Sequence, residues 1–269
     1  MITHIFKILL LSFAFTFFNG STASSAPIRK DKPLKVLSYN IHHANPPSKP
    51  NYIDLPAIAK VIKESGADLV ALQEVDVNTI RSGKGINQAE ELGRLTGMNF
   101  FFVKGIDFEG GEYGIGILSK FQILETDSLR LPMKEGLGGE PRVVAMITVE
   151  PIKGKQLIFA STHLDLKPEH RELQAKAIVQ KLGNSKTPVI LAGDFNAKPD
   201  SEVIAIFDKN FKRSSIPNGF TIPVVKPNRE IDFVMYSPEK KFQVKKHVVI
   251  NETYASDHLP VLVEFNIKN

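Results

Sequence analysis

The sequence predicts an α/β fold in a single domain built on large β-sheets, and three observations lead to it. Segments with the pattern of strands outnumber those with the pattern of helices, and both kinds continue to the C-terminal end. Of the 269 residues, 42% are hydrophobic and 23% are charged, which suits one large domain with a substantial core. No repeat, low-complexity tract or linker follows residue 33, so we expect one domain rather than two.

Helices are predicted where apolar residues recur at helical spacing, which occurs at 54–65, 88–96 and 168–182. Gly66 and Gly183 follow the first and last of these as stop signals, and Pro168 suits a first helical turn. Short apolar or alternating runs predict strands at 34–41, 68–75, 100–103, 114–118, 143–149, 157–162, 188–192, 231–236 and 260–265.

The N-terminal residues have the pattern of a secretory signal peptide. Lys7 precedes an unbroken apolar run at 8–18, and small residues follow up to Ala26. The run is too short for a membrane span, which needs roughly 20 residues. We therefore expect residues 1–26 to be a signal peptide and residues 27–269 to be the domain of a secreted or periplasmic protein without a stable membrane span. An uncleaved anchor or a buried core helix is the alternative.

The net charge and the absence of cysteine limit the kinds of substrate and site that the protein can have. The formal charge is +5, and one of these charges is Lys7, so the mature chain is near +4. This mild excess suits an anionic substrate but does not demonstrate nucleic-acid binding. The absence of cysteine excludes a lipid-anchored bacterial lipoprotein, disulfides and thiolate zinc sites. A basic cluster lies between late strands, and we interpret it as a solvated hairpin: Lys240, Lys241, Lys245 and Lys246.

Polar residues gather at six places where predicted strands end, which is where α/β enzymes carry reactive groups. The six are Ser38-Tyr39-Asn40, Leu72-Gln73-Glu74, Thr162-His163-Leu164-Asp165, Gly193-Asp194-Phe195-Asn196, Ile231-Asp232 and Ser256-Asp257-His258. Their amide and carboxylate oxygens suit Mg²⁺, Mn²⁺ or Ca²⁺, and histidines near carboxylates suit phosphate binding and proton transfer. The serine-hydrolase GxSxG, phosphate-binding GxxxxGK[ST] and zinc-protease HExxH motifs are absent.

Five of these motifs resemble, in order and spacing, those of the endonuclease/exonuclease/phosphatase family, which includes deoxyribonuclease I, exonuclease III and inositol-polyphosphate 5-phosphatases. They are LSYNI at 37–41, LQE at 72–74, THL at 162–164, GDFN at 193–196 and SDH at 256–258. The resemblance runs from about residue 34 to 265. It implies a deoxyribonuclease I-like four-layer sandwich, in which two facing mixed β-sheets are flanked by helices and the site lies at one end.

The resemblance also implies the metal ligands. Glu74 matches the principal metal-ligand glutamate, Asn40 matches the asparagine beside that metal, and Asp257 lies near it. The expected cofactor is Mg²⁺ (or Mn²⁺).

Five further residues take catalytic roles by the same resemblance. His163 contacts the scissile phosphate, Asp194 positions or deprotonates the attacking water, and Asn196 helps to orient that water. His258 is the catalytic histidine and Asp232 fixes its orientation. Asp257 and His258 are adjacent, so their side chains diverge on an extended backbone and His258 needs a more distant carboxylate. Either Asp194 or the Asp232–His258 pair acts as the base.

Three residues are candidates for substrate binding, each with a structural alternative. Arg81 lies in an RSG segment followed by Gln88, which resembles a secreted bacterial branch of the family, and it could reach a phosphate or belong to a plain glycine turn. Tyr113 opens a strand whose glycines could serve only to permit close packing. Arg142 follows Glu140-Pro141 before another strand and could approach the site or be a surface arginine. Three further residues are weaker candidates: Asp165, which we expect to begin the next helix rather than to hold a site loop, and His42 and His43, which could touch the substrate.

We therefore expect a monomeric, metal-dependent hydrolase that attacks a phosphodiester or other phosphate ester with activated water. The partner is a phosphate-ester substrate, and we lean towards nucleic acid and so a nuclease. The alternative is a phosphatase or phosphodiesterase of lipids or small molecules. A non-catalytic binding protein of the same fold is a further alternative.

Overall fold

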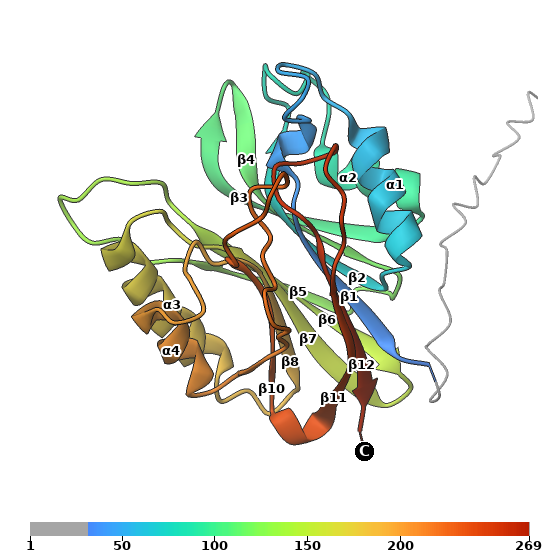
Figure 1. Cartoon of the computed structure of the whole chain (residues 1–269), viewed down its shortest axis with the longest axis vertical. Helices are drawn as coiled ribbons and strands as arrows, with labels where there is room; N and C mark the ends of the chain where they lie inside the picture. Colours follow the sequence, from blue (N-terminus) through green and yellow to red (C-terminus); the bar gives the residue numbers. More distant parts are fainter. Residues whose placement is uncertain (1–31, 269) are drawn as a thin grey trace, which may run out of the picture.

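A computed structural model describes residues 32–268, and in it two six-stranded sheets face each other (Figure 1). The first sheet has the order β11 (Phe242–Val249), β12 (Val261–Ile267), β1 (Leu34–Asn40), β2 (Leu69–Val77), β4 (Gly111–Ser119) and β3 (Asn99–Phe108). The second has the order β5 (Glu125–Arg130), β6 (Val143–Ile152), β7 (Lys155–His163), β8 (Val189–Asp194), β10 (Asp232–Ser237) and β9 (Lys212–Arg213). The β1–β2 and β7–β8 pairs are parallel and the other pairs are antiparallel, so both sheets are mixed.

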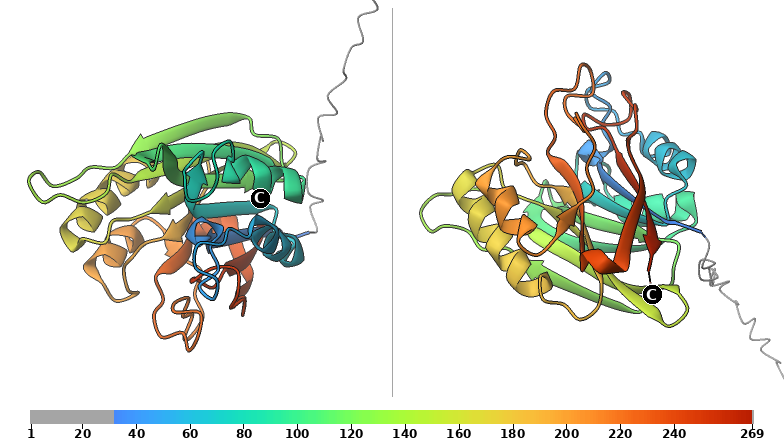
Figure 2. Two further views of the ribbon diagram at one scale, coloured as in Figure 1. Left: turned by 90° about the horizontal axis from the view of Figure 1, so that it is seen from above. Right: turned by 60° about the horizontal axis from the view of Figure 1, so that its bottom comes forward.

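Helices cover the outer face of each sheet, as the views in Figure 2 show. Helices α1 (Leu55–Ser65) and α2 (Gln88–Thr96) pack on the first sheet, and α3 (Pro168–Leu182) and α4 (Glu202–Asp208) pack on the second. Apolar side chains fill the space between the sheets. Val36 and Ala71 of the first sheet belong to the same buried cluster as Phe159 and Ile190 of the second. The predicted four-layer sandwich is therefore confirmed.

Local signals explain where the first helix begins and ends. The Asp54 carboxylate accepts a hydrogen bond from the Ala57 N–H at 3.0 Å, which satisfies one of the free donors of the first turn. Gly66 follows the last turn with a left-handed φ of 67°, a conformation that favours glycine. Helices α2 and α3 begin and end at the predicted residues.

Some elements were not predicted. Strand β5 is almost wholly exposed and therefore lacks the apolar alternation of a half-buried strand, while α4 and β9 are short. The helical spacing of Leu173, Ala177, Ile178 and Leu182 predicts the buried face of α3, but the structure buries His170 and Gln174 there and leaves Leu173 and Ala177 half-buried. The predicted signal peptide lies outside the described residues. Within residues 32–268, every helix is too short or too polar to cross a membrane.

The lysine cluster belongs to a solvated edge of the first sheet. Lys240 and Lys241 lie in the 3-10 helix Glu239–Lys241, and Lys245 and Lys246 are exposed on the edge strand β11. Because β11 and β12 are antiparallel, the 3-10 helix lies at the end of the sheet where β1 starts, and the polar motifs lie at the other end, where β1 finishes.

Candidate active site

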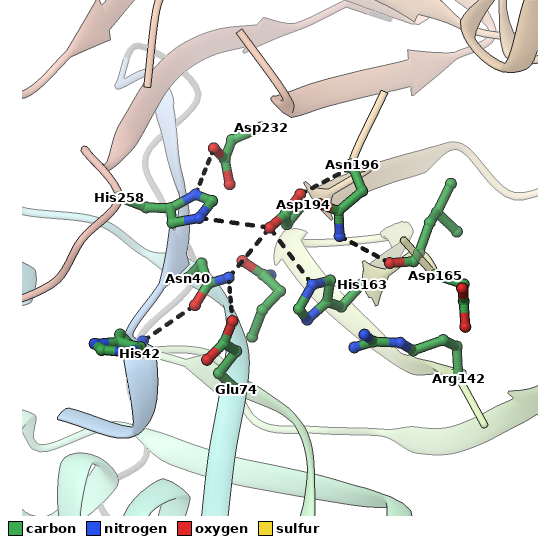
Figure 3. Close-up of polar contacts among 12 residues, drawn as sticks. Asn40, His42, Glu74, Arg142, His163, Asp165, Asp194, Asn196, Asp232 and His258 are labelled. Carbon is green, nitrogen blue, oxygen red and sulfur yellow. Dashed lines mark hydrogen bonds and ion pairs between the residues drawn. The ribbon is translucent and has the colours of Figure 1, made fainter. Parts of the chain in front are cut away.

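The Asp194 carboxylate lies at the centre of the polar residues, at the end of β8 (Figure 3). Its Oδ2 accepts a hydrogen bond from Asn40 Nδ2 at 3.1 Å and lies 3.5 Å from His163 Nε2 and 3.7 Å from His258 Nε2. Its Oδ1 accepts a hydrogen bond from the Asn196 N–H at 2.8 Å. One carboxylate thus joins four of the predicted site residues, which come from both sheets.

Strand register brings these residues together. His163 pairs with Asp194 across the parallel β7–β8 ladder, and Asp194 pairs with Asp232 across the antiparallel β8–β10 ladder. Gly193 permits the close approach of β7 and β8, because a Cβ at this position would collide with the Thr162 carbonyl oxygen. The sheets are also tied beside the site by a hydrogen bond from Gln73 Nε2 to Ser161 Oγ at 3.1 Å.

Asp232 and His258 form a buried pair. The His258 Nδ1 lies 2.9 Å from Asp232 Oδ2, which also accepts a hydrogen bond from Thr221 Oγ1. Burial alone would lower the pKa of His258, but the Asp232 carboxylate, helped by Asp194, outweighs it and raises this pKa to about 10. The structure therefore places the Asp232 carboxylate within hydrogen-bond distance of His258, the pairing that the family resemblance implied.

Burial sets the protonation of two other groups. Burial, followed by the nearby charge of Asp232, raises the pKa of Asp194 to about 7. Burial, with the positive charge of Arg142 second, lowers the pKa of His163 well below its usual value, so this imidazole is neutral near pH 7. The Asp194 carboxylate, which can gain or lose a proton near neutral pH, thus lies between the charged imidazole of His258 and the neutral imidazole of His163.

Asn40 and Glu74 come from the parallel pair of the first sheet. A β-bulge between Leu72 and Val75 places Glu74 in a left-handed conformation with φ of 58°, and such bulges re-aim side chains. Asn40 Nδ2 donates to Glu74 Oε1 at 3.0 Å as well as to Asp194, so the amide bridges the two carboxylates. Asn196 Nδ2 in turn donates to the Leu164 carbonyl.

Two groups of described side chains could hold a metal ion, each with its ligand atoms within 4.8 Å of one another. One contains His42, His43 and Glu74, and the other contains Asp194, Asp232 and His258. The first suits a divalent cation better, because the second already holds the proton shared by Asp232 and His258. Asp257, a predicted ligand, is half-buried and belongs to neither group, although its charge contributes to the raised pKa of His258.

His42 and His43 were predicted only as weaker candidates for substrate contact, not as metal ligands. Both lie in the 3-10 turn His42–Ala44 directly after Asn40. Burial, then the positive charge of Arg81, lowers the pKa of His43 to about 4, which leaves its ring neutral. The sequence feature that marks this turn is the pair of adjacent histidines that follows Asn40.

Arg81 and Tyr113 line one small cavity of about 110 Å³ with Ile106, Phe108 and Glu140. The Arg81 guanidinium forms two hydrogen bonds with Asp76, at 2.7 and 2.9 Å, and lies 4.5 Å from the centre of the Phe108 ring. It is 5.5 Å from the Tyr113 ring centre. Arg81 is therefore held in place by a buried carboxylate and by aromatic rings.

Arg142 is buried beside His163, and both line a second, narrower cavity. It forms an ion pair with Glu140 at 3.0 Å. Asp165 holds this loop, because its Oδ2 accepts a hydrogen bond from the Glu140 N–H, while its Oδ1 accepts one from the Lys167 N–H at the start of α3. Asp165 therefore holds the site loop and does not begin the helix as expected, because α3 starts at Pro168 with Lys167 as its N-cap.

The chain is similar in sequence to known proteins. A sequence profile described as the Endonuclease/Exonuclease/phosphatase family matches residues 37–258. The chain is 25% identical to the uncharacterized protein YbhP of Escherichia coli K12 over 248 residues, which cover 87% of this chain and 96% of YbhP.

Two solved structures share the fold. An endonuclease/exonuclease/phosphatase from Beutenbergia cavernae has a TM-score of 0.73 and 23% identity, over 88% of this chain and 72% of that one. A mannosyl-6-phosphatase from Bacteroides thetaiotaomicron has a TM-score of 0.68 and 24% identity, over 86% and 99%. With the profile match spanning most of the chain, these findings show that the chain belongs to the endonuclease/exonuclease/phosphatase family.

Proposed function

We propose that the protein is a metal-dependent phosphoesterase that hydrolyses its substrate with an activated water. The observation that carries this proposal is Asp194, a buried carboxylate with a pKa near 7 that lies within 4 Å of two imidazoles. A general base is most effective when its pKa is close to the working pH. A buried carboxylate beside two imidazoles favours a catalytic site over a non-catalytic binding protein of the same fold.

Asp194 is the base we favour over the Asp232–His258 pair. The Asp232 carboxylate keeps His258 protonated, and a charged imidazole cannot accept a proton from water. His258 is instead suited to stabilise the negative charge of the transition state or to donate a proton to the leaving oxygen. The Asn196 N–H bond to Asp194 Oδ1 fixes the carboxylate and leaves Oδ2 towards the imidazoles.

We propose that His163 and Arg142 contact the phosphoryl oxygens. His163 is neutral, so one ring nitrogen can donate a hydrogen bond, and Arg142 lies beside it with a positive charge. A divalent cation bound at Glu74, when present, supplies further charge stabilisation at the non-bridging oxygens, worth several kcal/mol. Asn40 orients Glu74 for this task through its hydrogen bond.

We propose a compact phosphate ester as the substrate. A nuclease grips several phosphates with lysines and arginines near its site, but Lys240 and Lys241 lie at the opposite end of the first sheet. Arg81, with Phe108 and Tyr113, instead lines a cavity of about 110 Å³, large enough for part of a small organic group. Aromatic faces beside charged groups suit a polyol or sugar, which is the substrate class named for the Bacteroides thetaiotaomicron relative.

The test is a hydrolysis screen with purified protein against sugar phosphates, phosphoinositides, sphingomyelin, model phosphodiesters, RNA and plasmid DNA. Asp194→Asn keeps the shape of the side chain, and we expect it to lower turnover by roughly 10²–10⁴-fold, the usual contribution of a general base. Asp200→Asn, at an exposed position shortly after the site loop, is the matched control and should leave turnover unchanged. Equal activity of Asp194→Asn and the wild type would refute the proposal.

We also propose that the protein is exported. The basis is the sequence alone, in which Lys7 precedes a short apolar run and small residues reach Ala26. N-terminal sequencing of the protein recovered from outside the cytoplasm should find a start near Ser24 or Pro27. A chain that retains Met1 in the membrane fraction would support an anchor instead.

A further inference from the structure

The turn that follows Asn40 has an unusual backbone. His42, His43 and Ala44 have φ angles of 46°, 43° and 59°, so three consecutive residues with side chains are left-handed. A left-handed helical conformation costs roughly 1–2 kcal/mol per residue for L-amino acids. Such strain persists only where surrounding contacts enforce it, and it concentrates at functional sites.

Hydrogen bonds to both flanks hold this turn. The His42 N–H donates to Asn40 Oδ1 at 3.1 Å, and the Asp54 N–H donates to the Ala44 carbonyl at 2.7 Å. Buried Gln88 donates from Nε2 to the His43 carbonyl at 2.8 Å. The turn is therefore fixed from within the fold.

Gln88 belongs to a buried network that also uses the RSG segment. Its Oε1 accepts a hydrogen bond from the Asp76 N–H at 3.0 Å, and its Nε2 also donates to Ser82 Oγ. Ser82 Oγ in turn donates to the Asp76 carboxylate, which holds Arg81. Through Gln88, the RSG segment is thus connected to the backbone of His43 and is more than a plain glycine turn.

The imidazoles are prepared for coordination. His42 Nδ1 lies 2.9 Å from the Asn45 carbonyl oxygen, which can only accept, so Nδ1 carries the hydrogen and Nε2 keeps its lone pair. A backbone carbonyl in this role is typical of the outer contacts of metal-bound histidines. The Nδ1 of His43 is buried without a hydrogen-bond partner. The two rings lie edge to face, with centroids 4.5 Å apart.

We propose that His42, His43 and Glu74 form a cation site that prefers a transition metal to Mg²⁺. Their ligand atoms lie within 4.8 Å of one another, and all three residues are half-buried and so within reach of solvent ions. Metal–ligand distances of about 2.0–2.2 Å require ligand atoms about 3–4 Å apart, so small side-chain movements close the site. Imidazole with carboxylate suits Mn²⁺, Fe²⁺, Co²⁺ or Zn²⁺, whereas Mg²⁺ favours oxygen and water.

The site shares Glu74 with the cation of the proposed phosphoesterase, so its catalytic importance rests on the proposed function. The binding itself does not, and it can be measured without any substrate. If the site is correct, the metal the protein uses is selected by the two histidines and not by Asn40, Glu74 and Asp257 alone.

The experiment is calorimetric titration of metal-free purified protein with Co²⁺, Mn²⁺ and Mg²⁺, together with the visible absorption of the Co²⁺ form. We expect Co²⁺ to bind at least about tenfold more tightly than Mg²⁺, in line with the order of divalent-metal affinities at nitrogen-containing sites. His42→Gln and His43→Gln should each weaken Co²⁺ binding by at least about tenfold and change its spectrum. Mg²⁺ affinity should change by less than about threefold, because Mg²⁺ does not favour imidazole.

His247→Gln is the matched control, since His247 is a half-buried histidine on β11 with an unpartnered Nδ1. It should bind Co²⁺ as the wild type does. A double His42→Gln/His43→Gln variant with unchanged Co²⁺ affinity and spectrum would overturn the proposal. So would equal affinity of the wild type for Co²⁺ and Mg²⁺.

A variant that fails to fold does not end the test. Pulsed electron paramagnetic resonance of the Mn²⁺-loaded wild type should detect nitrogen couplings from two imidazoles. These couplings should persist in His163→Gln and His258→Gln, and a spectrum without imidazole couplings would overturn the site. Turnover separates the two proposals. If Co²⁺ binds through both histidines but no ester is hydrolysed, only the proposed function is refuted. If hydrolysis requires Asp194 but metal binding does not depend on the histidines, only this metal site is refuted.

Discussion

The two sheets each contain one parallel pair of strands linked by a helix, and each pair brings polar side chains to the site. The β1–β2 pair, linked by α1, carries Asn40 and Glu74, and the β7–β8 pair, linked by α3, carries His163 and Asp194. Their environments differ, because Glu74 is half-buried whereas Asp194 is only 1% exposed. The same supersecondary unit thus supplies an accessible carboxylate in one half and a buried one in the other.

Neighbouring elements cause this difference. Strand β10 pairs with β8 and places Asp232 beside Asp194, and the loop before β12 brings His258 within 3.7 Å of Asp194. In the other half, the bulge in β2 turns Glu74 towards the turn that holds His42 and His43. Ions enter from solvent and proton transfer benefits from a low dielectric, so we infer that the first half binds the cation and the second half moves the proton.

Removal of the metal should have the largest effect and tests the first half. EDTA treatment should abolish hydrolysis, because a cation worth several kcal/mol in the transition state corresponds to a loss of roughly 10³-fold or more. Addition of Mn²⁺, Co²⁺ or Mg²⁺ should restore turnover, and circular dichroism should show that the fold survives chelation. Full hydrolysis in EDTA would contradict the metal-dependent mechanism.

Loss of His258 tests the second half. His258→Ala should remain folded and lose roughly 10²–10⁴-fold in turnover, the usual contribution of an acid–base group. Asp232→Asn should have a similar or milder effect, since it acts through His258. The double variant should be little worse than His258→Ala, because residues that act as a unit are not additive. If His258→Ala kept wild-type turnover, His258 would have no catalytic role. His247→Ala is the control and should keep wild-type turnover.

Glu74→Gln should separate metal use from stability. Glu74 is half-buried at a strand end, and glutamine retains a group that can accept the Asn40 hydrogen bond. We expect a weaker affinity for the activating metal, by roughly 10–100-fold, with little change in melting temperature of the metal-free protein. A large loss of melting temperature would mean that Glu74 is structural.

Asp194→Asn should stabilise the metal-free protein at alkaline pH. The folded-state pKa of Asp194 is about 7, above its ordinary value of 3.8, so folding favours the protonated carboxyl. Stability from this group is present at low pH and is lost as the pH rises towards and through 7. The melting temperature of Asp194→Asn relative to wild type should therefore be higher at pH 8 than at pH 5. The opposite trend would show that ionised Asp194 is stabilised by its imidazole neighbours.

The sequence was most informative where a motif and a strand end coincide. Asn40, His163, Asp194 and His258 were predicted to share a site, and the structure brings them together around Asp194. The bounds of α2 and α3 were predicted correctly, and for α3 the local signals were Pro168 in its first turn and Gly183 after its last.

What could not be predicted depends on contacts between distant residues. The left-handed conformation of Glu74 comes from a bulge against β4, and the pKa of Asp194 comes from burial between sheets. The backbone of His43 is held by a hydrogen bond from Gln88, which follows it by 45 residues. Local sequence carries no signal for such burial, so His42 and His43 were given no role in metal binding.

The smallest expected effect is the change of substrate affinity with salt concentration. This measurement distinguishes a compact ester from a polyanion as the substrate of the site. For a polyanion gripped through several phosphates, affinity should fall steeply with salt, with a log–log slope of roughly −0.9 per contact on duplex DNA. The clearest lysine cluster, at 240–246, begins at the end of the sheet far from Asn40, and Arg81 and Arg142 are each paired with a carboxylate. We therefore expect the KM for the best small ester to change little between low and physiological salt, with a slope shallower than about −1, and plasmid DNA to be a poor competitor. A steep slope accompanied by DNA cleavage would favour the nuclease and would place the substrate contacts outside the Arg81 cavity, while the roles assigned to Glu74 and Asp194 in the two halves would stand.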